Sequence, residues 1–311
     1  MVRKKIITVY SFIKIVLSEF VADNIFKYSA SLAYYTLFSL VPMLFIIITV
    51  CSTLFGSDAI QGQLYSQINE LVGNDAALQI QEAIKNIHLS NDSWGTSVLS
   101  IVILLIGATA IFSEIQDSLN KIWGLKIKTK KIWWKLLVDR FISFSLIISV
   151  GFVLMVSLAI NSVVMVVGTK LSYLLYGSNT YLLPIIQNII SFATIVFLFA
   201  IIFKTLPDAK IKWRDVIFGA IITAILFTIG KFAIGYYLGT TKIASLYGTA
   251  ATVIIILVWT YYSSIILYLG AVCTKVYAKL YGGKILPNEY ATFIKVEEIE
   301  VNNIKLNEVT N

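Results

Sequence analysis

Few side chains in this sequence are of the types that carry covalent chemistry. The chain has one histidine, His88, so a zinc site built on several histidines lacks its ligands. The two cysteines, Cys51 and Cys273, have no CxxC spacing and are interpreted as small apolar packing residues. No GxxxxGK[ST] loop is present to bind a nucleotide phosphate. We therefore expect a protein that is not an enzyme, holds no cofactor or metal, and does not hydrolyse ATP itself.

Lys231 is the most prominent polar residue within an apolar stretch. An ionisable side chain inside a membrane span is a candidate functional residue because it is costly to keep in lipid. Counted at 1.5 Å per residue, Lys231 lies roughly 22 Å from Val216, within reach of the outer surface by snorkelling. Two interpretations stay open: Lys231 lines a polar route for a substrate, or it extends to the outer surface.

Five other polar residues lie inside predicted spans or at their ends. Glu114 and Asp117 are one helical turn apart at the inner end of a span, and Asp139 with Arg140 opens the next one. We favour interfacial anchoring and ion pairing for these four over a place on a substrate path. Asn161 makes a hydrogen bond between helices or contributes to a polar path, and the sequence fits both.

One proline and two glycines indicate where helices bend or approach closely. Pro42 follows a run of small and hydroxyl residues and is expected to kink the first span, as helices beside transport sites often do. Gly235 and Gly239 form a GxxxG pair at the outer end of the fifth span. This pair predicts close helix packing and is compatible with a homo-oligomer.

Membrane helices are the elements that must position these residues. Of the 311 residues, 58% are hydrophobic and 14% are charged, and the mean hydropathy is +0.83. Such a composition lies outside the soluble range. A span needs about 20 apolar residues, and six fit between the charges. They are predicted near residues 28–55, 92–113, 141–167, 181–203, 216–238 and 246–272.

The positive charges predict the orientation of this all-α bundle. Of the 25 lysines and arginines, 21 fall in residues 1–27, 114–140, 204–215 and the C-terminal segment after the last span. Cytoplasmic segments carry such an excess, so both termini are predicted inside. The net charge of +8 is then explained by contact with anionic lipid headgroups, and nucleic acid is not expected as a partner.

Two segments flank the six-helix domain of residues 28–280, and one sizeable outer loop lies within it. Residues 1–27 have an apolar face from Ile6 to Phe20 and predict an amphipathic helix in the inner membrane surface. Residues 56–93 predict a helical hairpin on the outer side, with its turn near Gly73. Residues 281–311 are polar and are expected to form a flexible cytoplasmic tail.

Four stretches of this sequence resemble the YihY/BrkB family of bacterial membrane proteins. They are ASLAYYTLFSLVPML (30–44), GATAIFSEIQDSLNKIWG (107–124), KTLPDAKIKWRD (204–215), and LFTIGKFAIGYYLG (226–239) followed by YGTAATVIIILVWTYYSSIILYLGA (247–271). The resemblance covers about residues 20–280 with matching order and spacing. One position departs from the family pattern: Val272 stands where an acidic residue commonly follows the last span's Gly-Ala.

The resemblance implies a protein of the bacterial cytoplasmic membrane. Some members of this family resemble transporters of lipids or envelope precursors, and we expect this chain to move such a molecule. A protein that maintains the envelope as a scaffold, without a substrate, is the alternative. The family has also carried a ribonuclease label, but one histidine cannot supply the metal ligands for phosphodiester hydrolysis.

Overall fold

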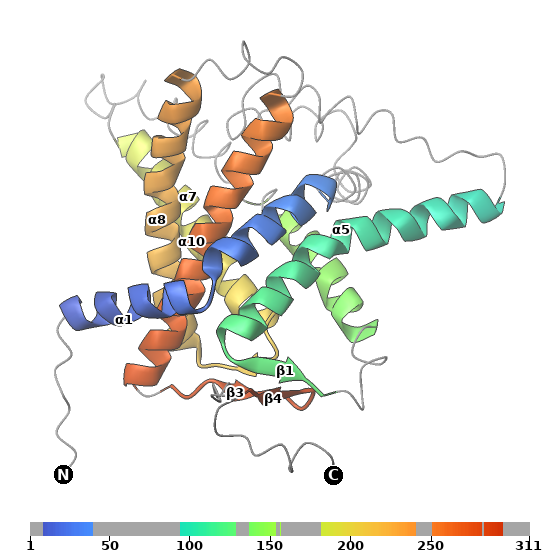
Figure 1. Ribbon diagram of the computed structural model, residues 1–311. Coiled ribbons are helices and arrows are strands. Elements are labelled where there is room, and N and C mark those ends of the chain that lie inside the picture. Colours follow the sequence, from blue (N-terminus) through green and yellow to red (C-terminus); the bar gives the residue numbers. More distant parts are fainter. Residues whose placement is uncertain are drawn as a thin grey trace, which may run out of the picture.

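The computed structural model describes residues 9–39, 94–128, 137–153, 156, 182–240, 251–281 and 283–294 (Figure 1). Most of these residues are helical, as the apolar composition requires, since a helix satisfies its own backbone hydrogen bonds in lipid. The helices are joined at one end by two short strand pairs. The fold is therefore a helical bundle with a small β component, rather than the purely helical fold that we expected.

Three of the described helices contain stretches long and apolar enough to cross a membrane. They are α7 (Leu182–Thr205), α8 (Trp213–Thr240) and α10 (Ala251–Tyr281). α8 packs against both α7 and α10, and Figure 1 shows α8 and α10 side by side. The bounds of α7 and α8 follow the predicted spans 181–203 and 216–238. α10 continues nine residues beyond the predicted end of the span at 272 and reaches the start of the predicted tail at 281.

The α8–α10 contact is built on two reciprocal pairs of small residues. A side-chain carbon added to Gly219 of α8 would lie 1.7 Å from Thr274 Oγ1, and one added to Gly270 of α10 would lie 1.7 Å from Thr223 Oγ1. Each threonine donates its hydroxyl hydrogen bond to the glycine carbonyl one turn earlier in its own helix. The two helices therefore interlock, threonine against glycine in both directions.

The N-terminal helix α1 (Val9–Ala22) packs against α10. Val16 and Phe20 are buried, whereas a second apolar stripe is exposed: Val9, Tyr10, Ile13, Leu17 and Val21. Asn24, in the left-handed conformation with φ 53°, ends α1, and a further helix occupies residues 25–39. The exposed stripe is what a helix at a membrane surface needs, and the membrane-surface location stays a prediction.

The helix α5 (Trp94–Ile122) extends beyond position 113, where the second span was predicted to end. Its last turn is closed by Gly124, whose φ of 69° is favoured by glycine. The chain then enters strand β1 (Leu125–Ile127). α5 thus carries residues of its inner half, including Ile115, Leu119 and Ile122, into the helical core, whereas Asp117 is exposed.

Two antiparallel strand pairs bring the C-terminal segment back onto the bundle. β1 pairs with β4 (Ala291–Phe293), and β2 (Ala209–Lys210) pairs with β3 (Leu286–Pro287). The expectation of a flexible tail is therefore wrong for residues 283–294. Backbone pairing with strands from two distant loops was not visible in the local sequence, which is polar and contains glycine and proline.

The segments predicted to be cytoplasmic contact one another at one end of the helices, which we call the inner end. α1 contacts the last turns of α10, β1 leads from α5 to β4, and β2 follows α7 and pairs with β3. Tertiary contacts therefore gather parts of residues 1–27, 114–140, 204–215 and the C-terminal segment. Pro42, the outer loop 56–93 and Asn161 lie outside the described residues.

Candidate functional site

A buried polar network lies at the inner end, between α5, the helix containing residues 137–153, and the loop after α7. Gln116 Nε2 donates to Asp139 Oδ1 at 3.1 Å and to Asp208 Oδ2 at 3.3 Å. Gln116, Asn120 and Asp208 are all buried. One amide thus joins two carboxylates from elements that are distant in sequence.

Asn120 and Asp208 form a reciprocal pair. Asn120 Nδ2 donates to Asp208 Oδ2 at 2.9 Å, and the Asp208 backbone N–H donates to Asn120 Oδ1 at 2.8 Å. The Asp208 carbonyl accepts a further bond from the backbone N–H of Asn288, before β4. A buried carboxylate is tolerated here because donors surround it. Asp208 thereby connects α5, the α7–α8 loop and the C-terminal strands.

Three of the four interfacial residues predicted from the sequence contact this region. Asp139 accepts from Gln116, and Arg140 donates from Nη1 to Thr109 Oγ1 of α5. Glu114 is half-buried and accepts from Ser118 Oγ at 3.5 Å. Asp117 is exposed. The structure therefore brings Asp139 and Arg140 onto α5 through hydrogen bonds, and their anchoring role at the membrane interface stays a prediction.

The hydrogen bonds of this network can hold helices in fixed positions. Within the described residues, no group of three or more histidine, cysteine or carboxylate side chains is arranged to hold a metal ion. Asp139 belongs to the helix containing residues 137–153 and Asp208 lies directly after α7, so Gln116 connects these two elements. Such a fully bonded buried network fixes geometry, since loss of one donor leaves charged partners unsatisfied.

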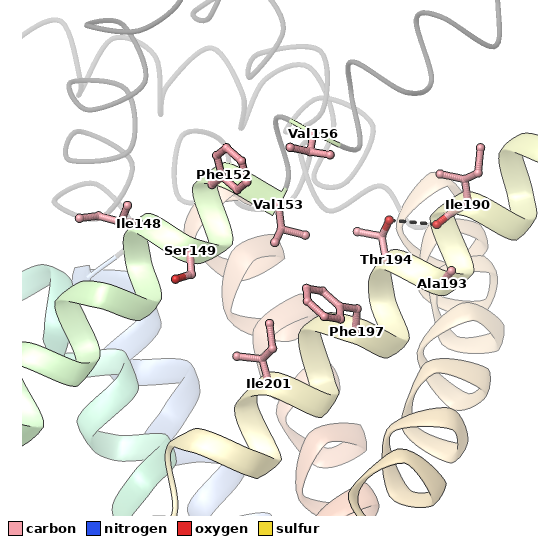
Figure 2. Close-up of a pocket in the computed structure, with 10 residues that line it drawn as sticks. All are labelled: Ile148, Ser149, Phe152, Val153, Val156, Ile190, Ala193, Thr194, Phe197 and Ile201. Carbon is pink, nitrogen blue, oxygen red and sulfur yellow. Dashed lines mark hydrogen bonds between the residues drawn. The ribbon is translucent and has the colours of Figure 1, made fainter. Parts of the chain in front are cut away.

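Between those two helices the structure has an open apolar groove of about 810 Å³ (Figure 2). One wall is the helix containing residues 137–153 and 156, and the other is α7. Figure 2 shows aromatic and aliphatic side chains from both walls directed into the space between them. The lining residues are Ile148, Ser149, Phe152, Val153, Val156, Ile190, Ala193, Thr194, Phe197 and Ile201. The groove lies at the level of the membrane-spanning stretch of α7.

A cation follows the groove-lining residues of α7 by one helical turn, toward the inner end. Lys204 follows Ile201 by three residues and continues the stripe that Ile190, Thr194 and Phe197 form on α7. Lys204 Nζ donates to the Ile211 carbonyl and lies 5.6 Å from the centre of the Trp213 ring. Lysine and tryptophan together mark the level of lipid headgroups in many membrane proteins.

A second charged cluster joins α1 to α10. Lys275 Nζ lies 2.8 Å from Glu19 and 2.9 Å from Asp23, and Lys279 Nζ lies 3.4 Å from Glu19. Burial raises the pKa of Glu19, but the two lysines outweigh it and hold that pKa below its usual value. Burial dominates at Asp23 and raises its pKa despite Lys275. The cluster fixes α1 to the inner end of α10.

The remaining predicted residues are dispersed. Lys231 is exposed on α8 and does not line the groove, so its place on a substrate route stays a prediction. Gly235 and Gly239 lie in the last two turns of α8. His88 and Cys51 fall outside the described residues, while Cys273 is buried and free, as a packing residue should be.

Sequence reasoning missed Gln116, Asn120, Asp208 and Lys204. Gln116 and Asn120 are one helical turn apart, with Thr109 and Ser113 on the same side of α5. This polar stripe in an otherwise apolar helix was the sequence signal from which a buried polar contact of α5 could have been predicted. Asp208 and Lys204 were treated only as members of a charged loop. The Asn120 partner of Asp208 lies 88 residues away, too far to be inferred locally, whereas Lys204 bonds the Ile211 carbonyl within its own loop.

The apolar helices and the groove between two of them define a helical membrane protein. Comparison with known families is consistent with that class: the chain belongs to the virulence factor BrkB family, whose model matches residues 16–291. This confirms the resemblance found in the four sequence stretches. No solved structure matches the chain.

Individual relatives carry the name UPF0761 membrane protein. That of Stenotrophomonas maltophilia strain R551-3 is 27% identical over 266 residues, which cover 84% of this chain and 59% of the relative. That of Haemophilus influenzae is 26% identical, covering 81% of this chain and 90% of the relative. That of Psychromonas ingrahamii is 28% identical, covering 88% and 89%. The chain thus spans little more than half of some relatives and most of others.

Proposed function

We propose that this protein moves an anionic amphiphile, a lipid or an envelope precursor, between the leaflets of the bacterial cytoplasmic membrane. The observation that carries the proposal is the open groove of about 810 Å³ between α7 and the helix containing residues 137–153 and 156. Its volume is in the range of small-molecule sites. Its lining is apolar, which suits the hydrocarbon part of an amphiphile.

The polar network supports the same proposal by explaining how the groove stays open. Two membrane helices without a ligand normally close on each other through van der Waals packing. Here Gln116 holds the inner ends of the two walls at a fixed separation by bonding Asp139 and Asp208. Large side chains such as Phe152 and Phe197 line the two walls. A scaffold without a substrate does not require this arrangement.

The proposal includes a topology of six spans with both termini in the cytoplasm. The distribution of 21 cations on one side supports it. So do the contacts at the inner end, because segments that pair as strands belong on the same side of the membrane. A reporter enzyme that is active only outside the membrane, fused after Asn311, should be silent. Activity of that fusion would contradict the topology.

Leaflet exchange in liposomes tests the function. Ala193→Trp should fill the groove and reduce the exchange of labelled phosphatidylglycerol to the rate of empty liposomes, because Ala193 lines its wall. Ser191→Trp is the matched control, since Ser191 is exposed on the opposite side of α7 and should leave exchange unchanged. Equal rates for wild type, Ala193→Trp and empty liposomes would contradict the transporter and favour the scaffold.

A further inference from the structure

We infer that the groove holds an acyl chain of an anionic lipid from the inner leaflet, with the lipid headgroup at Lys204. This inference rests on the proposed function and adds to it the ligand class, the leaflet and the orientation. It follows from three observations: the chemistry of the lining, the depth of the groove, and the charge at its inner end.

The lining leaves an acyl chain as the part of a lipid that fits. Its hydroxyl groups belong to Ser149 and Thr194. Ser149 donates to the Ser145 carbonyl at 2.7 Å, and Thr194 donates to the Ile190 carbonyl at 2.9 Å, as the dashed line in Figure 2 shows. Both hydroxyls are therefore directed at their own helices. A headgroup placed here would lose its water without gaining donors.

The depth of the groove corresponds to one leaflet. On α7 the lining runs from Ile190 to Ile201, which at 1.5 Å per residue is about 16 Å. This is roughly half of the 30 Å hydrocarbon core. The groove therefore accommodates the chain of a lipid in one leaflet, rather than a molecule that extends across the whole membrane.

The charge at the inner end determines which leaflet and which headgroup. Lys204 extends the groove-facing stripe of α7, and its ammonium group has three donors, of which one binds the Ile211 carbonyl. Trp213, next to it, is 53% exposed. Lys212 and Arg214, on either side of Trp213, are also exposed. Such a group of cations beside an interfacial tryptophan attracts an anionic headgroup.

Photolabelling tests the inference directly. Purified full-length protein is placed in phosphatidylcholine vesicles with a trace of phosphatidylglycerol or phosphatidylcholine that carries a diazirine on one acyl chain. The phosphatidylglycerol probe should label peptides containing residues 148–156 and 190–201 more strongly than the phosphatidylcholine probe. Ala193→Trp should remove labelling by both probes, because it occupies the space of the chain.

Substitutions at Lys204 separate the headgroup from the chain. Lys204→Gln keeps a donor for the Ile211 carbonyl but removes the charge, and should lower phosphatidylglycerol labelling about fivefold, the change for one cation near the membrane surface. Phosphatidylcholine labelling should stay constant. Lys204→Arg should retain the preference. Lys210→Gln is the matched control, since Lys210 is exposed in β2 of the same loop and should have little effect.

Three outcomes would overturn the inference. They are labelling that misses both walls of the groove, a phosphatidylglycerol preference that survives Lys204→Gln in folded protein, and crosslinks showing that a second copy or another segment of the chain fills the groove. The fate of the proposed function is read separately. Specific labelling without leaflet exchange supports the lipid site and contradicts the transporter. Leaflet exchange without a Lys204-dependent preference supports the transporter and contradicts the lipid site.

Discussion

The two sides of the helix group differ sharply in how they pack. α8 and α10 interlock through Gly219, Thr223, Gly270 and Thr274, and a third of the residues in their most apolar stretches are buried, 33% for each helix. In α7 only 6% of the corresponding residues are buried in the described part of the fold. All three helices are apolar, so hydropathy does not explain the difference. Small residues permit close contact, while the branched and aromatic residues of α7 keep its neighbour at a distance.

A direct test enlarges one small residue on each side. Gly219→Leu should destabilise the protein by about 3 kcal/mol, because even the first added carbon would lie 1.7 Å from Thr274 Oγ1 and the helices must separate. Ala193→Leu, in the groove, should change stability by less than about 0.5 kcal/mol. Thermal unfolding in detergent measures both. Similar losses of stability for Gly219→Leu and Ala193→Leu would show that protein fills the groove and that the two sides pack alike.

The second largest loss of stability is expected when the hydrogen bonds of Gln116, which connect the groove walls, are removed. Gln116→Leu should cost about 2 kcal/mol, since it removes one donor from Asp139 and one from Asp208 in a largely buried region. Asn188→Leu makes the same chemical change at an exposed position of α7 and should cost little. Chemical denaturation of the purified variants measures both. A Gln116→Leu protein as stable as wild type would show that the network does not hold the walls together.

The smallest effect is expected at the α1–α10 ion cluster. Lys275→Gln removes the partner of both Glu19 and Asp23 and should cost about 1 kcal/mol, less at high salt. Lys279→Gln is the control, because this side chain is 68% exposed and contacts Glu19 alone at 3.4 Å. Protease cleavage within α1 reports its release from α10. Equal cleavage rates for the two variants would contradict the expectation that Lys275 holds α1 on α10 more strongly than Lys279 does.

Helix ends and helical periodicity depend on residues close together in the sequence, and these features could be predicted from it. The ends of α7 and α8 were found within three residues, because apolar runs are bounded by charges such as Lys204 and Asp215. The helix of residues 9–22 was found from its periodic apolar residues. The family was found from four stretches and matches the chain over residues 16–291.

Features that depend on distant partners could not be predicted in this way. Asn120 and Asp208 are 88 residues apart, and neither residue type indicates which partner it will meet. Gly219 and Gly270 have no glycine at i+4 and so do not match GxxxG; their partner is a threonine on the facing helix. The groove is lined mostly by branched and aromatic residues of two helices that are distant in sequence. Only the assembled fold shows that these residues face each other.

The strand pairs at the inner end also set an order for the maturation of the chain. β1 leaves the ribosome long before its partner β4. The bond from the Lys128 side chain to the Glu289 carbonyl, beside this strand pair, joins residues 161 positions apart. β2 likewise waits for β3. Until residues 286–287 are synthesised β2 lacks its partner strand, and until residues 291–293 are synthesised β1 lacks its own. A chain without these residues should therefore keep two unpaired strand edges, the kind of edge through which chains associate.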